Sequence, residues 1–310
     1  MLSRLAESLY WVGRYSERAE DTARILDVHY HLVLEGTRVD AEQVWANLVR
    51  IMGLDAFPVG SAVTARAITD ALAYDPTYRS SIVGAMAAAR ENASGAREAI
   101  SAQMWECLNA TYHVLERFRE DPGGAGPHAF FEYIKERTAI LQGLADSTMS
   151  HDDGWRFLVL GRTLERVDMT ARLLSARLAE GVEATGWVTT LRSCSAHEAY
   201  LRAYRRAVDA SLVVEFLLLD RLFPRSVYSA LCQAEDCLAA LSPSVGRSGI
   251  DDDARRVLGR ARTDLEYRRA NELLRDLPAH LADVQAACSE VHTKVSERYF
   301  RHTQVVEWSA

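Results

Sequence analysis

The chain carries the same glutamate–arginine pattern twice. Residues 13–26 read GRYSERAEDTARIL and residues 161–174 read GRTLERVDMTARLL, so glycine, arginine, Glu-Arg, threonine, Ala-Arg and leucine recur without a gap. A guanidinium can pair with a neighbouring carboxylate, and grouped arginines can hold the carboxylate or phosphate of a ligand at two points. The repeated residues with this capacity are Arg14, Glu17, Arg18, Arg24, Arg162, Glu165, Arg166 and Arg172.

Helical spacing gathers the repeated charges on one face of each segment. At 3.6 residues per turn, one narrow stripe holds Gly13, Glu17, Glu20 and Arg24, and the other Gly161, Glu165, Asp168 and Arg172. Apolar residues flank the second stripe on both sides, which predicts that it is at least half buried and that its carboxylates have partners. Each glutamate of the two Glu-Arg pairs lies one turn from an arginine of its own helix, Arg14 or Arg162, and we expect these to pair.

The glycine at the start of each repeated segment indicates a close approach. Glycine inside a helix costs about 1 kcal/mol relative to alanine, so Gly13 and Gly161 predict contact with another helix or with a ligand.

Three interpretations of the stripes remain open at the level of sequence. The charges form an internal ion-pair network that fixes how two helices dock, as in a purely structural scaffold. Alternatively, arginines from both segments line a pocket for an anionic or carboxylate ligand. In the third interpretation the protein is a helical enzyme in which buried Glu17 or Glu165 is the acid or base, although a nearby arginine lowers a carboxylate pKa and weakens that role. Whether the chain is an enzyme is therefore left undecided.

A second dense segment follows at residues 90–105. It contains the further candidate ligand-binding residues Arg90, Glu91, Asn92 and Arg97. Read as one helix, it places the two arginines on one face with Ser101, joined by small residues on which arginines can converge. The alternative is a solvated helix with local ion pairs.

The elements that position these residues are all predicted to be helices, because apolar residues recur at helical spacing and no segment alternates as a strand does. Eight to ten helices are expected, with loops at 121–127 and 242–249. A fainter echo, residues 75–82 against 220–227, follows the first repeat in the same order. We predict an all-α, compact multi-helix bundle built from two diverged copies of a helical unit. It forms one domain over 1–310, with pseudo-repeats at about 1–147 and 148–310.

Composition excludes several classes of protein. The formal charge of −7 over 310 residues does not suit nucleic-acid binding, and the longest apolar run is too short to span a membrane. Five scattered cysteines form neither a disulfide framework nor a zinc motif. The first residues start an amphipathic helix rather than a signal peptide, so the expected compartment is the cytoplasm.

Cofactor and metal sites are not predicted. The chain lacks a glycine-rich phosphate loop followed by lysine and lacks a serine nucleophile motif. His29 and His31 project about 200° apart on a helix, and the Glu-x-x-His pairs of di-iron bundles are missing. We therefore expect no cofactor and no metal.

These segments together resemble one family. The two Glu-Arg pairs (Glu17, Arg18, Glu165 and Arg166), the segment from Arg90 to Trp105 and residues 223–227 (FPRSV) resemble the Alpha-E family, bacterial all-helical proteins named for a Glu-Arg motif. The resemblance runs from residue 2 to about 300. It implies partnership with a circularly permuted ATP-grasp protein and a transglutaminase-like protein, in a setting typical of peptide formation or modification. The function it favours is that of an accessory protein that presents a peptide or amino-acid substrate to the ligase.

Overall fold

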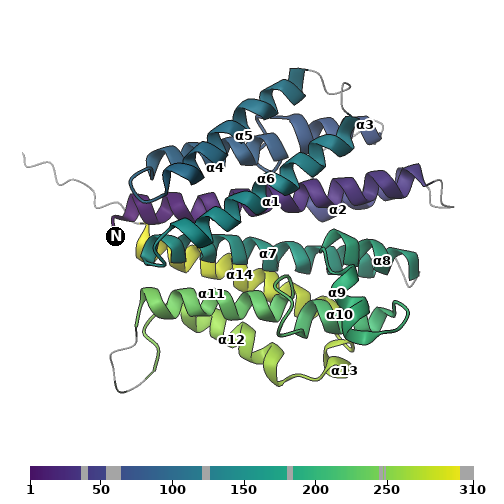
Figure 1. Ribbon diagram of the computed structural model, residues 1–310. Coiled ribbons are helices and arrows are strands. Elements are labelled where there is room, and N and C mark those ends of the chain that lie inside the picture. The colour runs from purple at the N-terminus through teal and green to yellow at the C-terminus, as the bar shows by residue number, and fades with distance from the viewer. Residues whose placement is uncertain are drawn as a thin grey trace, which may run out of the picture.

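The computed structural model describes residues 1–35, 41–53, 64–120, 126–179, 184–243, 247 and 249–300. All regular structure in these ranges is helical (Figure 1), which confirms the predicted all-α class. The elements are α1 (Ser3–Leu34), α2 (Ala41–Met52), α3 (Ala65–Thr69), the π-helical turn η1 (Asp70–Tyr74), α4 (Ile82–Gly95), α5 (Ala102–Glu120), α6 (Gly126–Thr148), α7 (Asp153–Ala179), α8 (Ala184–Ser193), α9 (His197–Tyr204), α10 (Ala210–Leu219), α11 (Val227–Leu241), α12 (Asp253–Tyr267), α13 (Ala270–Leu273) and α14 (Leu277–Tyr299).

The helices outnumber the eight to ten expected. Fourteen α-helices lie in the described ranges, and the excess comes from short ones such as α3, α9 and α13. A helix of four to eight residues completes too few turns to show a periodic apolar pattern.

Two long helices form the centre of the molecule. α1 and α7 run side by side in the same direction (Figure 1). The Met1 side chain lies beside Gly154 at the start of α7, and further along Arg24 of α1 contacts Ser195, just beyond α8. Both central helices are buried along most of their length, and Glu17, Glu165 and Arg166 lie inside the protein.

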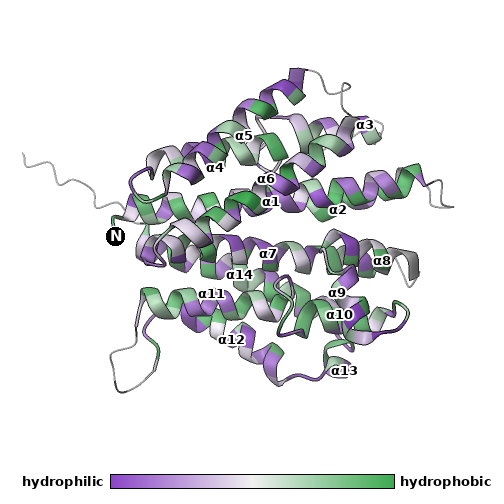
Figure 2. Cartoon of the chain, viewed as in Figure 1, coloured by the Kyte–Doolittle hydropathy of each residue, from purple (hydrophilic) through white to green (hydrophobic). Residues whose placement is uncertain are grey.

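The remaining long helices surround this pair in two similar groups. α4 and α6 pack on α1 and contact α5, while α11 and α14 pack on α7 and contact α12. One continuous apolar core runs through both groups. Polar and apolar stretches alternate along each surrounding helix (Figure 2), as expected of amphipathic helices with one face on a core.

The loops that lead into α4 and α11 have the same hydrogen bonds. Ser81 is the N-cap of α4 and Ser226 is the N-cap of α11. Each hydroxyl accepts a bond from the backbone N–H three residues later (2.9 and 3.1 Å) and donates to the carbonyl six residues earlier. These loops are the segments that echo one another in the sequence.

The predicted single helix through residues 90–105 is wrong. α4 ends at Gly95 and α5 starts at Ala102, so Arg97 and Ser101 do not continue the face that carries Arg90. The reason is local: glycine disfavours the helix interior, and the Ser101 hydroxyl caps the next helix by accepting a bond from Met104 N (3.1 Å).

Several smaller expectations have clear outcomes. All five cysteines are free thiols and four are buried. Asp152 caps the start of α7 by accepting a bond from Gly154 N (2.9 Å). Of the predicted loops, residues 121–125, 244–246 and 248 lie outside the described residues. Among the helices of the described part, none combines the length and apolar character that crossing a bilayer requires.

Candidate functional site

The two repeated glycines bring α1 and α7 into backbone contact. A Cβ on Gly13 would lie 2.0 Å from the Leu158 carbonyl oxygen, and one on Gly161 would lie 2.0 Å from the Tyr10 carbonyl oxygen. Only glycine fits at either position. The close approach expected from the sequence is thus made by a helix, and it is reciprocal.

Beyond this contact, each glutamate binds the arginines of the other helix. Glu17 accepts two bonds from Arg166 (2.8 and 2.9 Å). Glu165 accepts two from Arg18 (2.6 and 3.0 Å) and one from Arg14 (2.7 Å). Glu17 is fully buried and Glu165 is 3% exposed, so both carboxylates are neutralised inside the protein by bidentate pairs.

The predicted pairs within one helix, Arg14 with Glu17 and Arg162 with Glu165, are replaced by these crossed pairs. Because the helices touch at their glycines, an arginine of the neighbouring helix reaches each carboxylate with two nitrogens, Nε and Nη2. We use the name Glu–Arg cluster for Arg14, Glu17, Arg18, Arg162, Glu165, Arg166 and Arg225.

Arg225 is the member that the sequence analysis did not select. It comes from the loop before α11, and its Nη1 lies 2.9 Å from Glu17 and 2.7 Å from Asp21, while Nη2 lies 2.6 Å from Glu20. Gln142 of α6 donates to Glu17 (3.3 Å) and Glu20 (2.9 Å). The signal that could have found Arg225 is the echo at 220–227, which marked its loop without assigning the residue.

The charges in the cluster determine the protonation of its acids. Burial by itself raises the pKa of Glu17 and of Glu165, but the two guanidinium groups that face each carboxylate lower both pKa values to about 2. Both glutamates are ionised at neutral pH. Asp21 behaves in the opposite way, because burial raises its pKa to about 8 against the attraction of Arg225.

Arg162 is held least well of the arginines in the cluster. It is 6% exposed, and its Nε has no hydrogen-bond partner. Its closest carboxylate is Asp146, whose Oδ1 lies 3.9 Å from Nη2 and whose side chain is 48% exposed. Burial, followed by repulsion from Arg166, lowers the pKa of Arg162. The guanidinium is therefore a buried cation with little compensating negative charge.

An asymmetry between the two helices explains this state. Arg14 binds Glu165, but the matching partner of Arg162 would be Glu17, whose oxygens are occupied by Arg166 and Arg225. At the position of Arg225, the matching loop of the first half has Ser80, which carries no charge.

Two other selected arginines pair within their own helices. Arg24 binds Glu20, four residues earlier. Arg172 binds Asp168 at 2.8 Å, and its side chain is 42% exposed. Neither is bonded to the two central glutamates.

The residues selected at 90–97 form a separate group on the last turns of α4 and the segment that follows it. Arg90 donates to Asn109 (2.8 Å), and both Arg90 and Arg97 lie over the Trp105 ring at 5.5 and 4.6 Å. Asn92 donates to a carbonyl of its own helix (2.8 Å), and Glu91 is exposed. The arginines thus converge on an indole ring.

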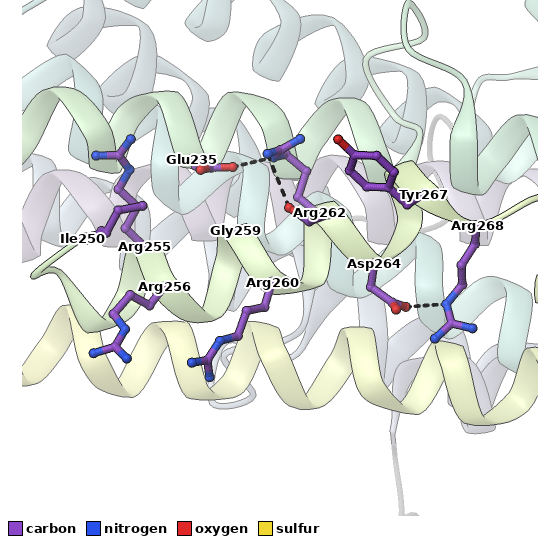
Figure 3. Close-up of a pocket in the computed structure, with 11 residues that line it drawn as sticks. Glu235, Ile250, Arg255, Arg256, Gly259, Arg260, Arg262, Asp264, Tyr267 and Arg268 are labelled. Carbon is purple, nitrogen blue, oxygen red and sulfur yellow. Dashed lines mark hydrogen bonds and ion pairs between the residues drawn. The ribbon is translucent and has the colours of Figure 1, made fainter. Parts of the chain in front are cut away.

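A basic groove lies along α12 (Figure 3). It has a volume of about 820 Å³, and its charged lining consists of Glu235, Arg255, Arg256, Arg260, Arg262, Asp264 and Arg268. Arg262 pairs with Glu235 (2.5 Å) and Arg268 with Asp264 (2.8 Å). Positive charge exceeds negative charge here although the whole chain is acidic. The groove is a second surface suited to an anion.

Comparison with protein families identifies the family of this chain. A family model described as a predicted α-helical domain with a conserved ER motif, Alpha-E, matches residues 1–300. The chain belongs to the Alpha-E family. In this Alpha-E protein, the glutamate of each Glu-Arg pair binds the arginine of the other pair, from α1 to α7 and from α7 to α1.

Relatives come from mycobacteria. This Alpha-E chain is 28% identical to the uncharacterised protein Rv2567 of Mycobacterium tuberculosis and to the uncharacterised protein Mb2597 of Mycobacterium bovis, over 93% of its own length. It covers 36% of each relative, so it spans about a third of those longer proteins. No solved structure matches it.

Proposed function

We propose that this Alpha-E protein is a cytoplasmic accessory protein that presents a substrate to an ATP-grasp-type peptide ligase and works with a transglutaminase-like protein in peptide formation or modification. The family's Glu-Arg motif supports this proposal through the partnership that the resemblance implies. The length of the mycobacterial relatives is compatible with it, because their Alpha-E region is joined to further chain.

We further propose that the chain is one domain over 1–310, formed from two copies at about 1–147 and 148–310. The support is that α4 and α6 pack on α1 and contact α5, as α11 and α14 pack on α7 and contact α12. The crossed ion pairs and the matching serine-capped loops support it as well. In this proposal the two carboxylates with their bidentate arginines fix the register of one copy on the other.

Within the cluster, we assign the carboxylate of the ligand to Arg162. The other arginines of the cluster already bind carboxylates at 2.6–2.9 Å, whereas Arg162 has an unbonded Nε and a single acid 3.9 Å away. Asp146 is half exposed. A ligand carboxylate that displaced it from the solvent side would bind the buried guanidinium of Arg162. The weakly paired, buried guanidinium of Arg162 is the observation that carries the proposal.

Acid–base catalysis by the central glutamates has less support. A general acid needs a pKa near the working pH, and the guanidinium groups hold Glu17 and Glu165 near a pKa of 2. Their oxygens are occupied by arginines, which leaves little room for proton transfer to a substrate.

Calorimetry on the full chain tests the ligand assignment. The probes are alanyl-alanine and its C-terminal amide, which differ by the carboxylate alone. We expect the free dipeptide to bind and the amide not to bind. Arg162→Gln should weaken binding at least tenfold, as loss of a charge-assisted hydrogen bond of about 1.5–3 kcal/mol requires. Arg172→Gln is the matched control, because Arg172 lies on the same helix and its side chain is 42% exposed.

Unchanged dipeptide binding by Arg162→Gln would refute the assignment. If Arg260→Gln then abolishes binding, the ligand lies in the α12 groove. If neither dipeptide nor amide binds and Arg162→Gln only loses stability, the cluster is structural. Co-purification of the chain with the ATP-grasp and transglutaminase-like proteins tests the partnership separately, and failure to retain either protein would contradict it.

A further inference from the structure

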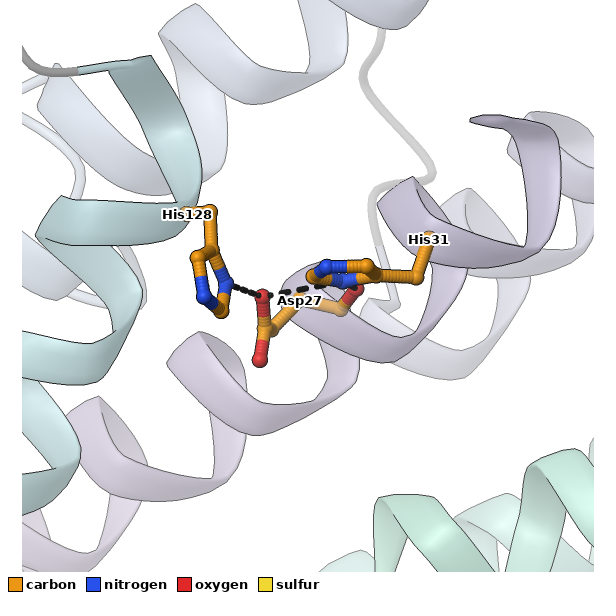
Figure 4. Close-up of side chains that lie close together, drawn as sticks. All are labelled: Asp27, His31 and His128. Atoms are coloured by element: carbon orange, nitrogen blue, oxygen red, sulfur yellow. Dashed lines mark hydrogen bonds and ion pairs between the residues drawn. The ribbon is translucent and has the colours of Figure 1, made fainter. Parts of the chain in front are cut away.

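Three metal-ligating side chains meet where α1 passes the start of α6. Asp27 and His31 are one turn apart on α1, and His128 lies on the first turn of α6. One donor atom from each lies within 4.8 Å of the others. Figure 4 shows the two imidazole rings on either side of the Asp27 carboxylate.

We infer that Asp27, His31 and His128 form a binding site for a first-row divalent metal ion, with Zn²⁺ the ion that suits them best. Two imidazoles and one carboxylate are a ligand set that zinc accepts readily and that magnesium and calcium do not prefer. Three protein ligands leave a coordination position for water. This inference is independent of the proposed function.

The distances fit a small rearrangement around an ion. His128 Nδ1 lies 2.7 Å and His31 Nδ1 lies 3.3 Å from Asp27 Oδ1. Ligands bound to zinc at about 2.1 Å in tetrahedral geometry are about 3.4 Å from one another. Binding therefore requires His128 to exchange its hydrogen bond to the carboxylate for a bond to the metal.

The surroundings orient the ligands and leave the site open. His31 Nδ1 also lies 2.9 Å from the Asp27 carbonyl oxygen. This contact holds the imidazole ring in place, and Nδ1 gives it up on binding the ion, with the ring proton then on Nε2. Asp27 is buried, whereas the side chains of His31 and His128 are 45% and 51% exposed. An ion can reach the site from solvent.

Lys135 competes with the ion for the carboxylate of Asp27. Its Nζ lies 2.7 Å from Asp27 Oδ2 and also binds Glu132. The ammonium occupies one oxygen and leaves Oδ1 as a monodentate ligand.

The sequence did not reveal this site, because the neighbouring histidines point apart. His29 is buried and its Nδ1 lies 2.7 Å from the Ile25 carbonyl oxygen. The second imidazole comes from His128, far along the chain, and only the packing of α6 on α1 brings it to His31.

The test uses the untagged full chain, stripped of metal with a chelator. Calorimetry with Zn²⁺ should show one ion bound per chain. Co²⁺ should give the visible absorption bands of a four-coordinate site. His128→Gln should weaken Zn²⁺ binding at least tenfold and remove the Co²⁺ bands. Circular dichroism should show an unchanged helical fold, since His128 is half exposed. His113→Gln is the matched control, because His113 is an exposed histidine beside Glu116 on α5.

A second variant separates a metal site from an ion pair. Lys135→Gln removes the competing ammonium and should tighten Zn²⁺ binding severalfold, because a nearby positive charge repels the ion. Absence of Zn²⁺ binding, or binding that His128→Gln leaves unchanged, would overturn the inference. Weaker binding by Lys135→Gln would also contradict the proposed competition.

Discussion

The contact between Gly13 and Gly161 can be tested by adding a single methyl group. In Gly13→Ala the new Cβ would lie 2.0 Å from the Leu158 carbonyl oxygen, and a carbon and an oxygen do not approach within 3.0 Å. The obstacle is backbone, which cannot rotate away as a side chain can. α1 and α7 must therefore separate by about 1 Å, the difference between these distances.

The expected cost follows from this displacement. Overpacking in a core costs about 1–3 kcal/mol, and separation of the helices lengthens the crossed bonds of Glu17 and Glu165, now 2.6–3.0 Å. Hydrogen bonds to charged groups contribute about 1.5–3 kcal/mol each. Alanine favours the helix by about 1 kcal/mol relative to glycine, which offsets part of this cost. We expect Gly13→Ala to lower the free energy of unfolding by about 3 kcal/mol.

Urea denaturation followed by tryptophan fluorescence and by circular dichroism measures this change. Gly143→Ala is the matched control, because Gly143 is an exposed glycine of α6 and a Cβ there meets no atom within 4 Å. It should stabilise the protein by up to about 1 kcal/mol. The double variant Gly13→Ala/Gly161→Ala should cost less than the sum of the single changes, because one displacement relieves both clashes. A Gly13→Ala protein as stable as Gly143→Ala would refute the reasoning.

Two further predictions concern pH. Glu17 and Glu165 have pKa values lowered from 4.5 to about 2, so the stability that they confer is complete above pH 4.5 and is lost as the pH falls toward 2. The urea concentration at the unfolding midpoint should therefore fall steeply over this pH range, and less steeply in Glu165→Gln. A pH dependence in Glu165→Gln equal to that of the native protein would contradict the assignment. Asp21 has a pKa raised from 3.8 to about 8, so folding binds its proton and stability falls as the pH rises between those values. Asp21→Asn should therefore be more stable than the native protein at pH 8 and have a flatter pH profile, and lower stability at pH 8 would show that the negative charge of Asp21 is needed beside Arg225.

Much of the architecture could be predicted from local patterns. The repeated segments had helical spacing with apolar flanks, and burial of the charges on α1 and α7 followed from those flanks. The glycines at 13 and 161 pointed to a close approach, because a helix tolerates glycine at a cost. The break at Gly95 was missed, since the apolar pattern continued across it and the capping bond of Ser101 depends on the backbone having already turned.

The partners of the charged groups were harder to predict. Sequence spacing favoured Arg14 for Glu17, one turn away, yet the structure pairs Glu17 with Arg166 and Arg225. Arg225 lies in a loop whose sequence echo was visible, but the direction of its side chain depends on how α11 packs on α7. His128 could not be assigned to Asp27 for the same reason.

By itself, the sequence determined that this protein is helical, that it repeats a Glu-Arg motif and that the two glutamates of this motif are buried. Helical periodicity and apolar flanks are properties of neighbouring residues. The tertiary structure decided which carboxylate binds which guanidinium, why Arg162 is left with a weak partner, and how His128 reaches Asp27. These depend on the register between helices distant in sequence. Backbone contact at Gly13 and Gly161 sets that register for α1 and α7, and the packing of α6 on α1 sets it for His128.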